Sequence, residues 1–183
     1  NDTAYESAIS LNKKGIKVEA IIDIREKPNS EFTTEAKSFG IKIYRSRTIV
    51  DTEGYKRINK ITIMELSKNG QSFANSEKIT LDCDCLAIAG GWTPAVHLFT
   101  QSGGKLKFRD KDQVFIPNTY PSKQVSIGSC NGDFELDDII KNTLKTLTEF
   151  LNIKETIYDD LKIKCSKDKV IRNIWLLPSD KVI

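Results

Sequence analysis

The chain of 183 residues has no run of about 18 apolar residues, only one histidine, four cysteines and almost no excess of one charge. Without a long apolar run, no segment is expected to span a membrane. The 28 basic and 25 acidic residues give a formal net charge of +3, and the two kinds are interleaved, so we expect no nucleic-acid partner. Residues 1–14 lack a basic start followed by an apolar stretch, so no secretory signal peptide is expected.

The cysteines and the histidine do not form the pattern of a metal site or a catalytic group. Cys83 and Cys85 lie one residue apart on a predicted strand, where side chains alternate between faces, whereas a zinc knuckle needs a Cys-x-x-Cys turn. His97 and Cys130 have no activating partner close in sequence, so we expect both to be packed side chains. The sequence therefore predicts no metal site, reduced thiols in a cytoplasmic protein, and no self-contained active site.

Apolar residues make up 39% of the chain, which is enough to build a folded core. Their spacing and the turn residues between them predict an α/β fold, with a Rossmann-like parallel sheet and an antiparallel β excursion. The elements expected in the first half are a helix over 1–14, a strand over 17–23, a helix over 30–39, a strand over 41–44 and two antiparallel runs over 57–66 and 73–81. Asn1 and Asp2 are expected to cap the first helix and Ser30 the second.

The second half of the sequence has fewer regular patterns. Cys85–Ala89 is an apolar run without polar alternation, which is typical of a central strand covered on both faces. Residues 125–127 predict another short buried strand. Residues 137–151 have apolar side chains at helical spacing and predict an amphipathic helix.

The clearest functional signal lies at the end of the strand over 17–23. A strand that ends in an acid and follows a helix beginning with small residues is typical of the second half of a dinucleotide-binding unit. In such a unit Asp23 accepts hydrogen bonds from the adenosine ribose, about 20 residues beyond the phosphate-binding turn. This carboxylate repels a 2′-phosphate and favours NAD over NADP. Arg25 leaves two interpretations open, flanking the adenine or tolerating a phosphate, and the alternative role of Asp23 is to cap a loop.

The phosphate-binding turn departs from the pattern Gly-x-Gly-x-x-Gly. The strand and the first glycine position are missing, and Asn1 takes the second glycine position and Ala4 the third. Asparagine tolerates unusual backbone angles, and alanine permits close helix packing. The amide groups from Asp2 to Tyr5 are expected to face the pyrophosphate. The Asp2 carboxylate has the wrong charge for that neighbour unless it points away.

Further candidate residues follow the apolar run over 85–89. Gly90, Gly91 and Trp92 stand where this predicted strand leaves the sheet, and glycine allows the backbone to approach a flat ligand at such a place. The stretch over 125–133 has the same form. It is either a ligand contact or a glycine-rich loop between strand and helix.

Four stretches of the chain together resemble the α subunit of heterotetrameric sarcosine oxidase: Asn1–Tyr5, Ala20–Arg25, Ala89–Leu106 and Gly128–Gly132. The specific one runs from Gly-Gly-Trp to Gly-Gly-Lys-Leu, and the resemblance extends over essentially the whole chain. It implies a fold like that of the pyridine nucleotide–disulfide oxidoreductases. It also implies that Asp23 binds the NAD ribose, the turn Asn1–Tyr5 the pyrophosphate, and Gly90–Trp92 the dinucleotide pocket.

The resemblance further implies how the chain is organised and what surrounds it. Residues 1–151 are expected to be an NAD-binding domain without its first strand, and residues 152–183 a linker into an absent folate-binding, aminomethyltransferase-like domain, so that the chain is a fragment. The assembled enzymes of this family demethylate sarcosine oxidatively to glycine with FAD, FMN and tetrahydrofolate, and form hydrogen peroxide and methylene-tetrahydrofolate. Catalysis is housed in the β subunit, and γ and δ subunits complete the complex.

Two alternatives remain open at this point. The first is an α-like subunit of a related amino-acid dehydrogenase of the N-methylglutamate dehydrogenase type, whose α-like chains share these motifs. The second is a non-catalytic scaffold for subunit interaction in which the nucleotide site has decayed.

Overall fold

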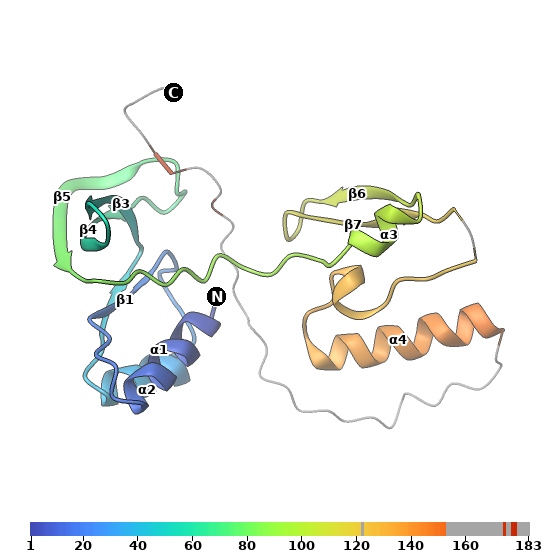
Figure 1. Cartoon of the computed structure of the whole chain (residues 1–183), viewed down its shortest axis with the longest axis horizontal. Coiled ribbons are helices and arrows are strands. Elements are labelled where there is room, and N and C mark those ends of the chain that lie inside the picture. Colours follow the sequence, from blue (N-terminus) through green and yellow to red (C-terminus); the bar gives the residue numbers. More distant parts are fainter. Residues whose placement is uncertain (122, 153–173, 175–176, 179–183) are drawn as a thin grey trace. The chain divides into compact units, whose positions relative to one another are not determined.

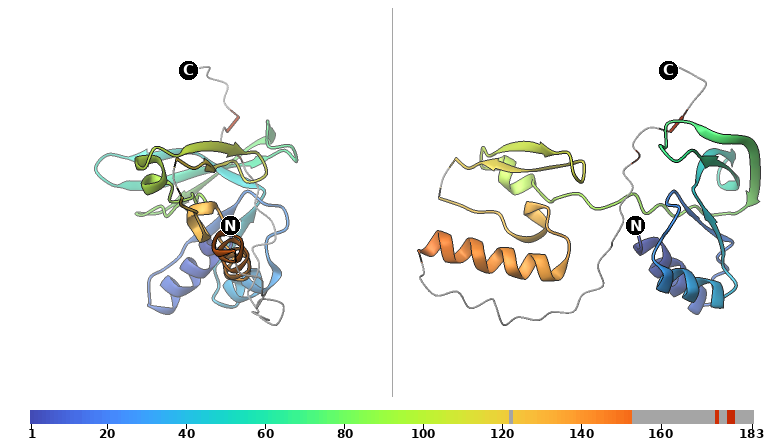
Figure 2. Two further views of the ribbon diagram at one scale, coloured as in Figure 1. Left: turned by 90° about the vertical axis from the view of Figure 1, so that its right-hand side faces the viewer. Right: turned by 180° about the vertical axis from the view of Figure 1, so that it is seen from behind.

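The computed structural model describes residues 1–121, 123–152, 174 and 177–178. The described residues form two compact units, one made by residues 1–90 with the described residues near the C-terminus, and one made by residues 91–152. Figures 1 and 2 trace both units. The range 1–151, expected to be one domain, thus contains two compact units. The predicted linker lies outside the described residues except at Asn152, Ile174, Leu177 and Pro178.

The first unit begins with the helix–strand–helix–strand order that the sequence predicts. Its elements are α1 (Thr3–Lys13), β1 (Ala20–Asp23), α2 (Ser30–Ser38) and β2 (Lys42–Arg45). β1 and β2 pair in parallel, with Ala20 opposite Lys42 and Asp23 opposite Arg45. The parallel pair confirms the predicted α/β fold, and it brings Asp23 to the carboxyl edge of this sheet.

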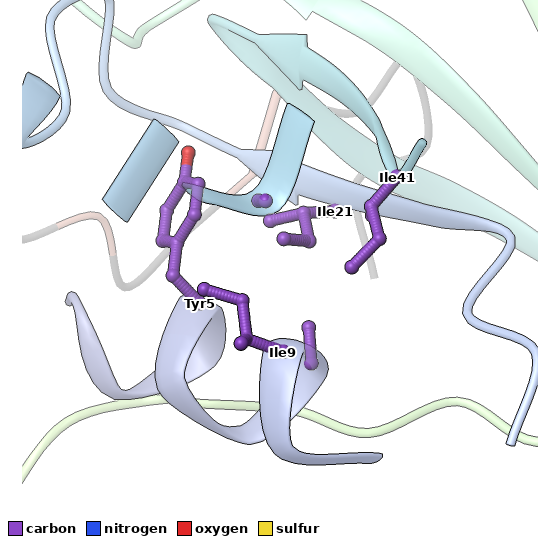
Figure 3. Packing of buried hydrophobic residues seen from close by; sticks show 6 residues of the cluster. Tyr5, Ile9, Ile21 and Ile41 are labelled. Atoms are coloured by element: carbon purple, nitrogen blue, oxygen red, sulfur yellow. The ribbon is translucent and has the colours of Figure 1, made fainter. Parts of the chain in front are cut away.

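Both helices pack on the parallel pair through a small apolar core (Figure 3). Its buried members are Tyr5, Ala8, Ile9, Ile21, Ala36 and Ile41. Tyr5 and Ile9 are four residues apart and therefore lie on the same face of α1, against Ile21 of β1. The ring of Tyr5 is held in this core, so its hydroxyl has a fixed position near the end of β1.

The cap of α2 is Asn29 rather than the predicted Ser30. The Asn29 side-chain oxygen accepts a hydrogen bond from the N–H of Glu31 at 3.0 Å. Ser30 is already the first residue of the helix. Both residue types are favourable caps, so the sequence alone does not choose between two that are adjacent.

A three-stranded antiparallel sheet follows in the same unit, formed by β3 (Arg47–Gly54), β4 (Ile58–Leu66) and β5 (Phe73–Asp82). β4 and β5 confirm the two predicted antiparallel runs. β3 is absent from the predicted elements because its second half is exposed and offers no apolar alternation. Ser46 joins this sheet to the loop after β1, since its N–H donates to the carbonyl of Arg25 at 3.2 Å and its carbonyl accepts from Leu66 N–H at 2.7 Å.

The two apolar runs predicted as buried strands, 85–89 and 125–127, are not strands. Ile88 is 80% exposed, and Val125 and Ile127 are exposed as well. An apolar run becomes a central strand only where other strands flank it. Within the described residues the parallel sheet consists of β1 and β2 alone, so both strand predictions are wrong.

The second unit contains a β-hairpin and the predicted amphipathic helix. Its elements are α3 (His97–Gln101), β6 (Lys105–Arg109), β7 (Val114–Thr119), the 3₁₀ helix η1 (Gly128–Asn131) and α4 (Leu136–Leu151). α4 confirms the helix expected over 137–151, whereas the hairpin of β6 and β7 is not among the predicted elements. Arg109 ties the hairpin to the loop after η1, because its Nη2 donates to the carbonyl of Gly132 at 2.8 Å. In the part of the chain that the structure describes, no helix is long and apolar enough to cross a membrane.

Candidate functional site

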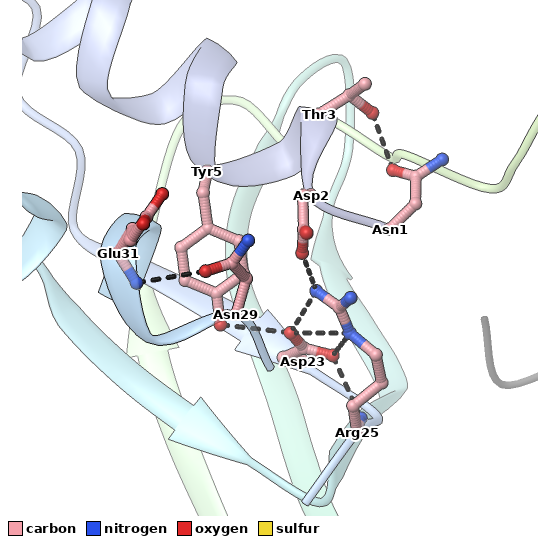
Figure 4. Close-up of polar contacts among 8 residues, drawn as sticks. All are labelled: Asn1, Asp2, Thr3, Tyr5, Asp23, Arg25, Asn29 and Glu31. Carbon is pink, nitrogen blue, oxygen red and sulfur yellow. Dashed lines mark hydrogen bonds and ion pairs between the residues drawn. The ribbon is translucent and has the colours of Figure 1, made fainter. Parts of the chain in front are cut away.

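Four buried side chains meet where α1 begins and β1 ends (Figure 4). They are Asp2, Tyr5, Asp23 and Arg25, and we call them the Asp23 cluster. Asp2 precedes α1 and Tyr5 lies in its first turns, while Asp23 ends β1 and Arg25 follows in the loop. The helix packs its first turns against the carboxyl edge of the parallel pair, and this packing brings the two short segments together.

Arg25 clamps the carboxylate of Asp23. Arg25 Nε lies 3.1 and 3.2 Å from the two carboxylate oxygens, and Nη2 lies 2.9 Å from Oδ2. The backbone N–H of Arg25 donates to Oδ1 at 2.9 Å, and the Tyr5 hydroxyl donates to Oδ2 at 2.9 Å. A carboxylate offers about four lone-pair positions. These donors therefore fill the acceptor capacity of Asp23.

Arg25 also pairs with Asp2, whose Oδ1 lies 2.7 Å from Arg25 Nη2. Asp2 occupies the N-cap position of α1, but its side chain makes no capping hydrogen bond. Its backbone carbonyl accepts from the N–H groups of Tyr5 and Glu6, at 2.9 and 3.2 Å. The predicted capping role of the Asp2 side chain is therefore wrong, and an ion pair takes its place. Arg25 thus shares its positive charge between Asp23 and Asp2, the carboxylate that the sequence places beside the predicted phosphate position.

The contacts within the Asp23 cluster keep Asp23 and Arg25 ionised and Tyr5 neutral. Burial alone raises the pKa of the Asp23 carboxyl, but the hydrogen bonds and the charge of Arg25 outweigh burial and hold the pKa below its usual value. Burial also opposes the charge of Arg25, yet the bonds to Asp23 and Asp2 raise its pKa. Burial, followed by the negative charge of Asp23, raises the pKa of Tyr5, so its hydroxyl keeps the proton that it donates.

The first turn of α1 supplies the second part of a possible nucleotide site. The first N–H groups of a helix have no partner within the helix and attract an anion. Here those of Thr3 and Ala4 precede the internally bonded N–H groups of Tyr5 and Glu6. A dinucleotide needs N–H groups that donate to its phosphates, beside an acid that accepts from its ribose hydroxyls. Asp23 is able to accept from a ribose hydroxyl only when Arg25 or Tyr5 releases one of its hydrogen bonds to the carboxylate.

The remaining candidates are divided between the two units. Gly90 belongs to the first unit, and Gly91 and Trp92 belong to the second. They lie in a segment without helix or strand, where Gly91 has a positive φ of 125° and Trp92 is 61% exposed. The members of the Asp23 cluster all lie between residues 2 and 25 in the chain, and Gly90, Gly91 and Trp92 are not among them.

His97 and Cys130 are exposed, so the prediction that they are packed side chains is wrong. His97 is the first residue of α3, and Cys130 lies in η1. Short helical turns at the surface leave such side chains in solvent even when their neighbours are apolar. Among the described residues, no three His, Cys, Asp or Glu side chains lie close enough together to hold a metal ion.

The sequence contains a signal for the Asp23 cluster in the opposite charges of Asp2 and Arg25. The order helix, strand, loop places the start of α1 and the end of β1 at one edge of the sheet, where the two charges attract each other. The sequence predicts a role for the amide group of Tyr5 in the turn, but not the bond from its hydroxyl to Asp23.

Three curated proteins similar to the chain are α subunits of sarcosine oxidase. The protein of Corynebacterium sp. strain P-1 is 31% identical over 137 residues, which are 74% of the chain and 14% of that protein. That of Rhizobium meliloti strain 1021 is 29% identical over 130 residues, 70% of the chain and 12% of that protein. That of Corynebacterium sp. strain U-96 is 25% identical over 181 residues, 98% of the chain and 18% of that protein. The chain thus spans less than a fifth of these relatives, and the resemblance inferred from its motifs is confirmed.

Solved structures give a likeness of fold. Thioredoxin reductase of T. acidophilum matches with a TM-score of 0.51 and 18% identity, over 71% of the chain and 42% of that protein. L-proline dehydrogenase from P. horikoshii matches with a TM-score of 0.44 and 18% identity, over 76% of the chain and 28% of that protein. The first likeness confirms the predicted disulfide-oxidoreductase-like α/β fold. No protein-family model matches the chain.

Proposed function

We propose, from its kinship with the α subunits of sarcosine oxidase, that the chain is an NAD-binding part of such a subunit. In this proposal the pyrophosphate lies at the turn formed by Asn1, Asp2, Ala4 and Tyr5, and Asp23 receives the hydroxyls of the adenosine ribose. The observation that carries the proposal is the position of Asp23 at the carboxyl edge of a parallel β-pair, beside the N-terminus of α1. Gly90, Gly91 and Trp92 stay predicted contacts of the dinucleotide.

The role of the whole protein is part of the same proposal. The complex oxidatively demethylates sarcosine to glycine with FAD, FMN and tetrahydrofolate, yielding hydrogen peroxide and methylene-tetrahydrofolate, and the chain works beside β, γ and δ subunits. Support comes from the names of the three curated relatives. The chain contributes a cofactor platform rather than the chemical step. In support, the buried charged groups among its described residues, Asp2, Asp23 and Arg25, pair with one another in an internal cluster.

A second candidate is a scaffold for subunit contacts whose nucleotide site has decayed. The filled acceptor positions of Asp23 favour it, because Arg25 and Tyr5 already take the place that ribose hydroxyls would occupy. The two candidates differ in one measurable property. A working site releases one of these bonds when NAD arrives, and a decayed site does not bind NAD at all.

Isothermal titration of the full chain with NAD⁺ tests the proposal. We expect saturable binding, and we expect Asp23→Asn to weaken it about 10- to 100-fold, the loss that follows from removing hydrogen bonds to a charged group worth about 1.5–3 kcal/mol. Absence of binding at millimolar NAD⁺ would contradict the proposal and leave the scaffold.

Glu35→Gln is the matched control for this titration. Glu35 is an acid of the same unit, and its pair with Lys13 at 2.9 Å is exposed. Its removal costs little stability and leaves the Asp23 cluster intact. We expect NAD⁺ to bind this variant as it binds the wild type, so an equal loss in both variants would point to a general defect rather than to a lost ribose contact.

A further inference from the structure

Two carboxylates share one arginine in the Asp23 cluster. Arg25 Nη2 lies 2.7 Å from Asp2 Oδ1 and 2.9 Å from Asp23 Oδ2, and all three side chains are at most 7% exposed (Figure 4). One positive charge against two negative charges gives a formal charge of 1 − 2 = −1 for the group. The cluster is thus a buried site with a net negative charge, although it contains an arginine.

The position of Arg25 is the one from which an arginine recognises a 2′-phosphate. In dinucleotide-binding units the acid after the second strand binds the ribose 2′-hydroxyl, and a nearby arginine accommodates the 2′-phosphate of NADP. Here the guanidinium is turned into the cluster and is 4% exposed. The backbone of Arg25 is anchored on both sides, by its N–H to Asp23 Oδ1 at 2.9 Å and by its carbonyl to Ser46 N–H at 3.2 Å. Only its side chain is therefore able to turn outward.

We propose that Asp2 is a specificity-determining residue, which withholds Arg25 from a 2′-phosphate and so restricts the site to dinucleotides with a free 2′-hydroxyl. The inference rests on the proposed NAD site. A phosphate monoester carries about −1.5 to −2 charges at pH 7, and beside a cluster of charge −1 it is repelled. A free ribose hydroxyl is neutral and donates to Asp23. Asp23 alone disfavours the phosphate, and Asp2 holds back the guanidinium of Arg25, which would offset part of this repulsion.

Titration of the full chain with NAD⁺ and NADP⁺ tests the role of Asp2. Asp2→Asn keeps the shape of the side chain and brings the formal charge of the cluster to zero. We expect the ratio of the NADP⁺ dissociation constant to that of NAD⁺ to fall at least 10-fold in Asp2→Asn, through tighter NADP⁺ binding. Asp2→Glu keeps the charge and is expected to keep the wild-type preference for NAD⁺.

A merely structural role for Asp2 gives a different result. It would weaken both nucleotides equally in Asp2→Asn, and an unchanged ratio would overturn the inference while leaving the proposed function in place. Failure of the wild type to bind NAD⁺ would overturn the proposed function and the inference with it.

The salt dependence of the wild-type chain provides a test without any substitution. The pyrophosphate is common to both nucleotides, so its salt dependence cancels in the ratio of dissociation constants. Repulsion of the 2′-phosphate is screened by salt, so we expect the preference for NAD⁺ to narrow as sodium chloride is raised from 20 to 300 mM. If Arg25 instead attracts the phosphate, salt weakens NADP⁺ binding more than NAD⁺ binding and the preference for NAD⁺ widens, which would overturn the inference.

Discussion

Asp23 is held by four donor groups, three of them on Arg25 and one on Tyr5. Its buried charge is stable because these donors replace the water that it loses. The sequence predicts the acid at the end of β1, since a buried strand closed by a polar residue is a local pattern. The three donors of Arg25 are also local, only two residues away, but the hydroxyl of Tyr5 comes from 18 residues earlier in the chain.

Replacing Tyr5 with phenylalanine isolates one of these bonds. The ring stays in the core and the hydroxyl is lost, so we expect the free energy of unfolding at pH 7 to fall by about 1.5–3 kcal/mol, the range for a hydrogen bond to a charged group. The pKa of Tyr5 is raised in the folded protein, so its stabilisation is complete below pH 10 and is lost as the pH rises further. Urea unfolding at pH 7 and 10.5 measures both effects. If wild type and Tyr5→Phe differ in the free energy of unfolding by the same amount at pH 7 and at pH 10.5, this explanation is contradicted.

The acid side of the stability profile depends on Asp23. Its pKa is lower in the folded protein than its ordinary value of 3.8. The contribution of Asp23 to the free energy of unfolding is therefore complete above about pH 4 and is lost as the pH falls further toward the folded pKa. We expect Asp23→Asn to be less stable than the wild type at pH 7, with a difference that narrows below about pH 4.

Urea unfolding at successive pH values measures this narrowing. Glu35→Gln serves as the control for the loss of a carboxylate from the same unit, since its pair with Lys13 is exposed. A constant difference between Asp23→Asn and the wild type across the acid range would show that Asp23 does not titrate with folding.

At the scale of elements, local patterns predict α1, α2, β1, β2, β4, β5 and α4, because apolar spacing, helix caps and stops, and strong turn residues are all written in short stretches of sequence. The runs over 85–89 and 125–127 are continuously apolar. Such a run becomes a buried central strand only where other strands flank it. β6 alternates polar and apolar residues from Lys105 to Arg109, so the hairpin of β6 and β7 has a local strand pattern that the predicted elements leave out. Phe99 of α3 and Tyr120, which flank the hairpin in the chain, meet edge to face with ring centroids 5.0 Å apart.

Gly104 tests how tightly this small unit is packed. A Cβ at Gly104 would lie 2.4–2.6 Å from three atoms of the Phe99 ring. Phe99 is buried and contacts Tyr120, so the ring has little room to move. We expect Gly104→Ala to destabilise the unit by about 1–3 kcal/mol, the usual cost of overpacking, measured by thermal unfolding.

Gly90→Ala is the matched control. A Cβ at Gly90 meets nothing within 4 Å, and its φ is not positive, so stability is expected to change by only a few tenths of a kcal/mol. Equal effects of the two substitutions would contradict the close packing of Gly104 on Phe99.

At the scale of the whole molecule, residues 1–151 comprise two units, and the segment between β5 and α3 contains no helix or strand. The motifs of the sequence identify the relatives and the fold class correctly. They place Asp23 at the carboxyl edge of the parallel pair, but they do not foresee that Arg25 binds both Asp23 and Asp2. Charge pairing inside a folded core depends on which segments meet, and this is known only when the packing is known.

The exposed segment between the units predicts where a protease cuts. Trp92 is 61% exposed and lies outside helices and strands, and such segments are the preferred sites of nicking. Limited digestion with chymotrypsin is expected to cut after Trp92 among its early sites, together with the exposed bend at Tyr55, with mass spectrometry identifying the products. Trp92→Ala should remove the cut at this position. Early cleavage inside β4 or α1 would contradict the division into two units.

Hydrogen–deuterium exchange of the full chain with and without NAD⁺ tests the location of the nucleotide site most directly. We expect NAD⁺ to slow exchange in peptides covering residues 1–9 and 20–29, which contain the first turn of α1 and the Asp23 cluster. The same peptides of Asp23→Asn should show little slowing, whereas Glu35→Gln should behave as the wild type. Slower exchange confined to residues 91–152, or no change anywhere at millimolar NAD⁺, would contradict the placement of the site at Asp23.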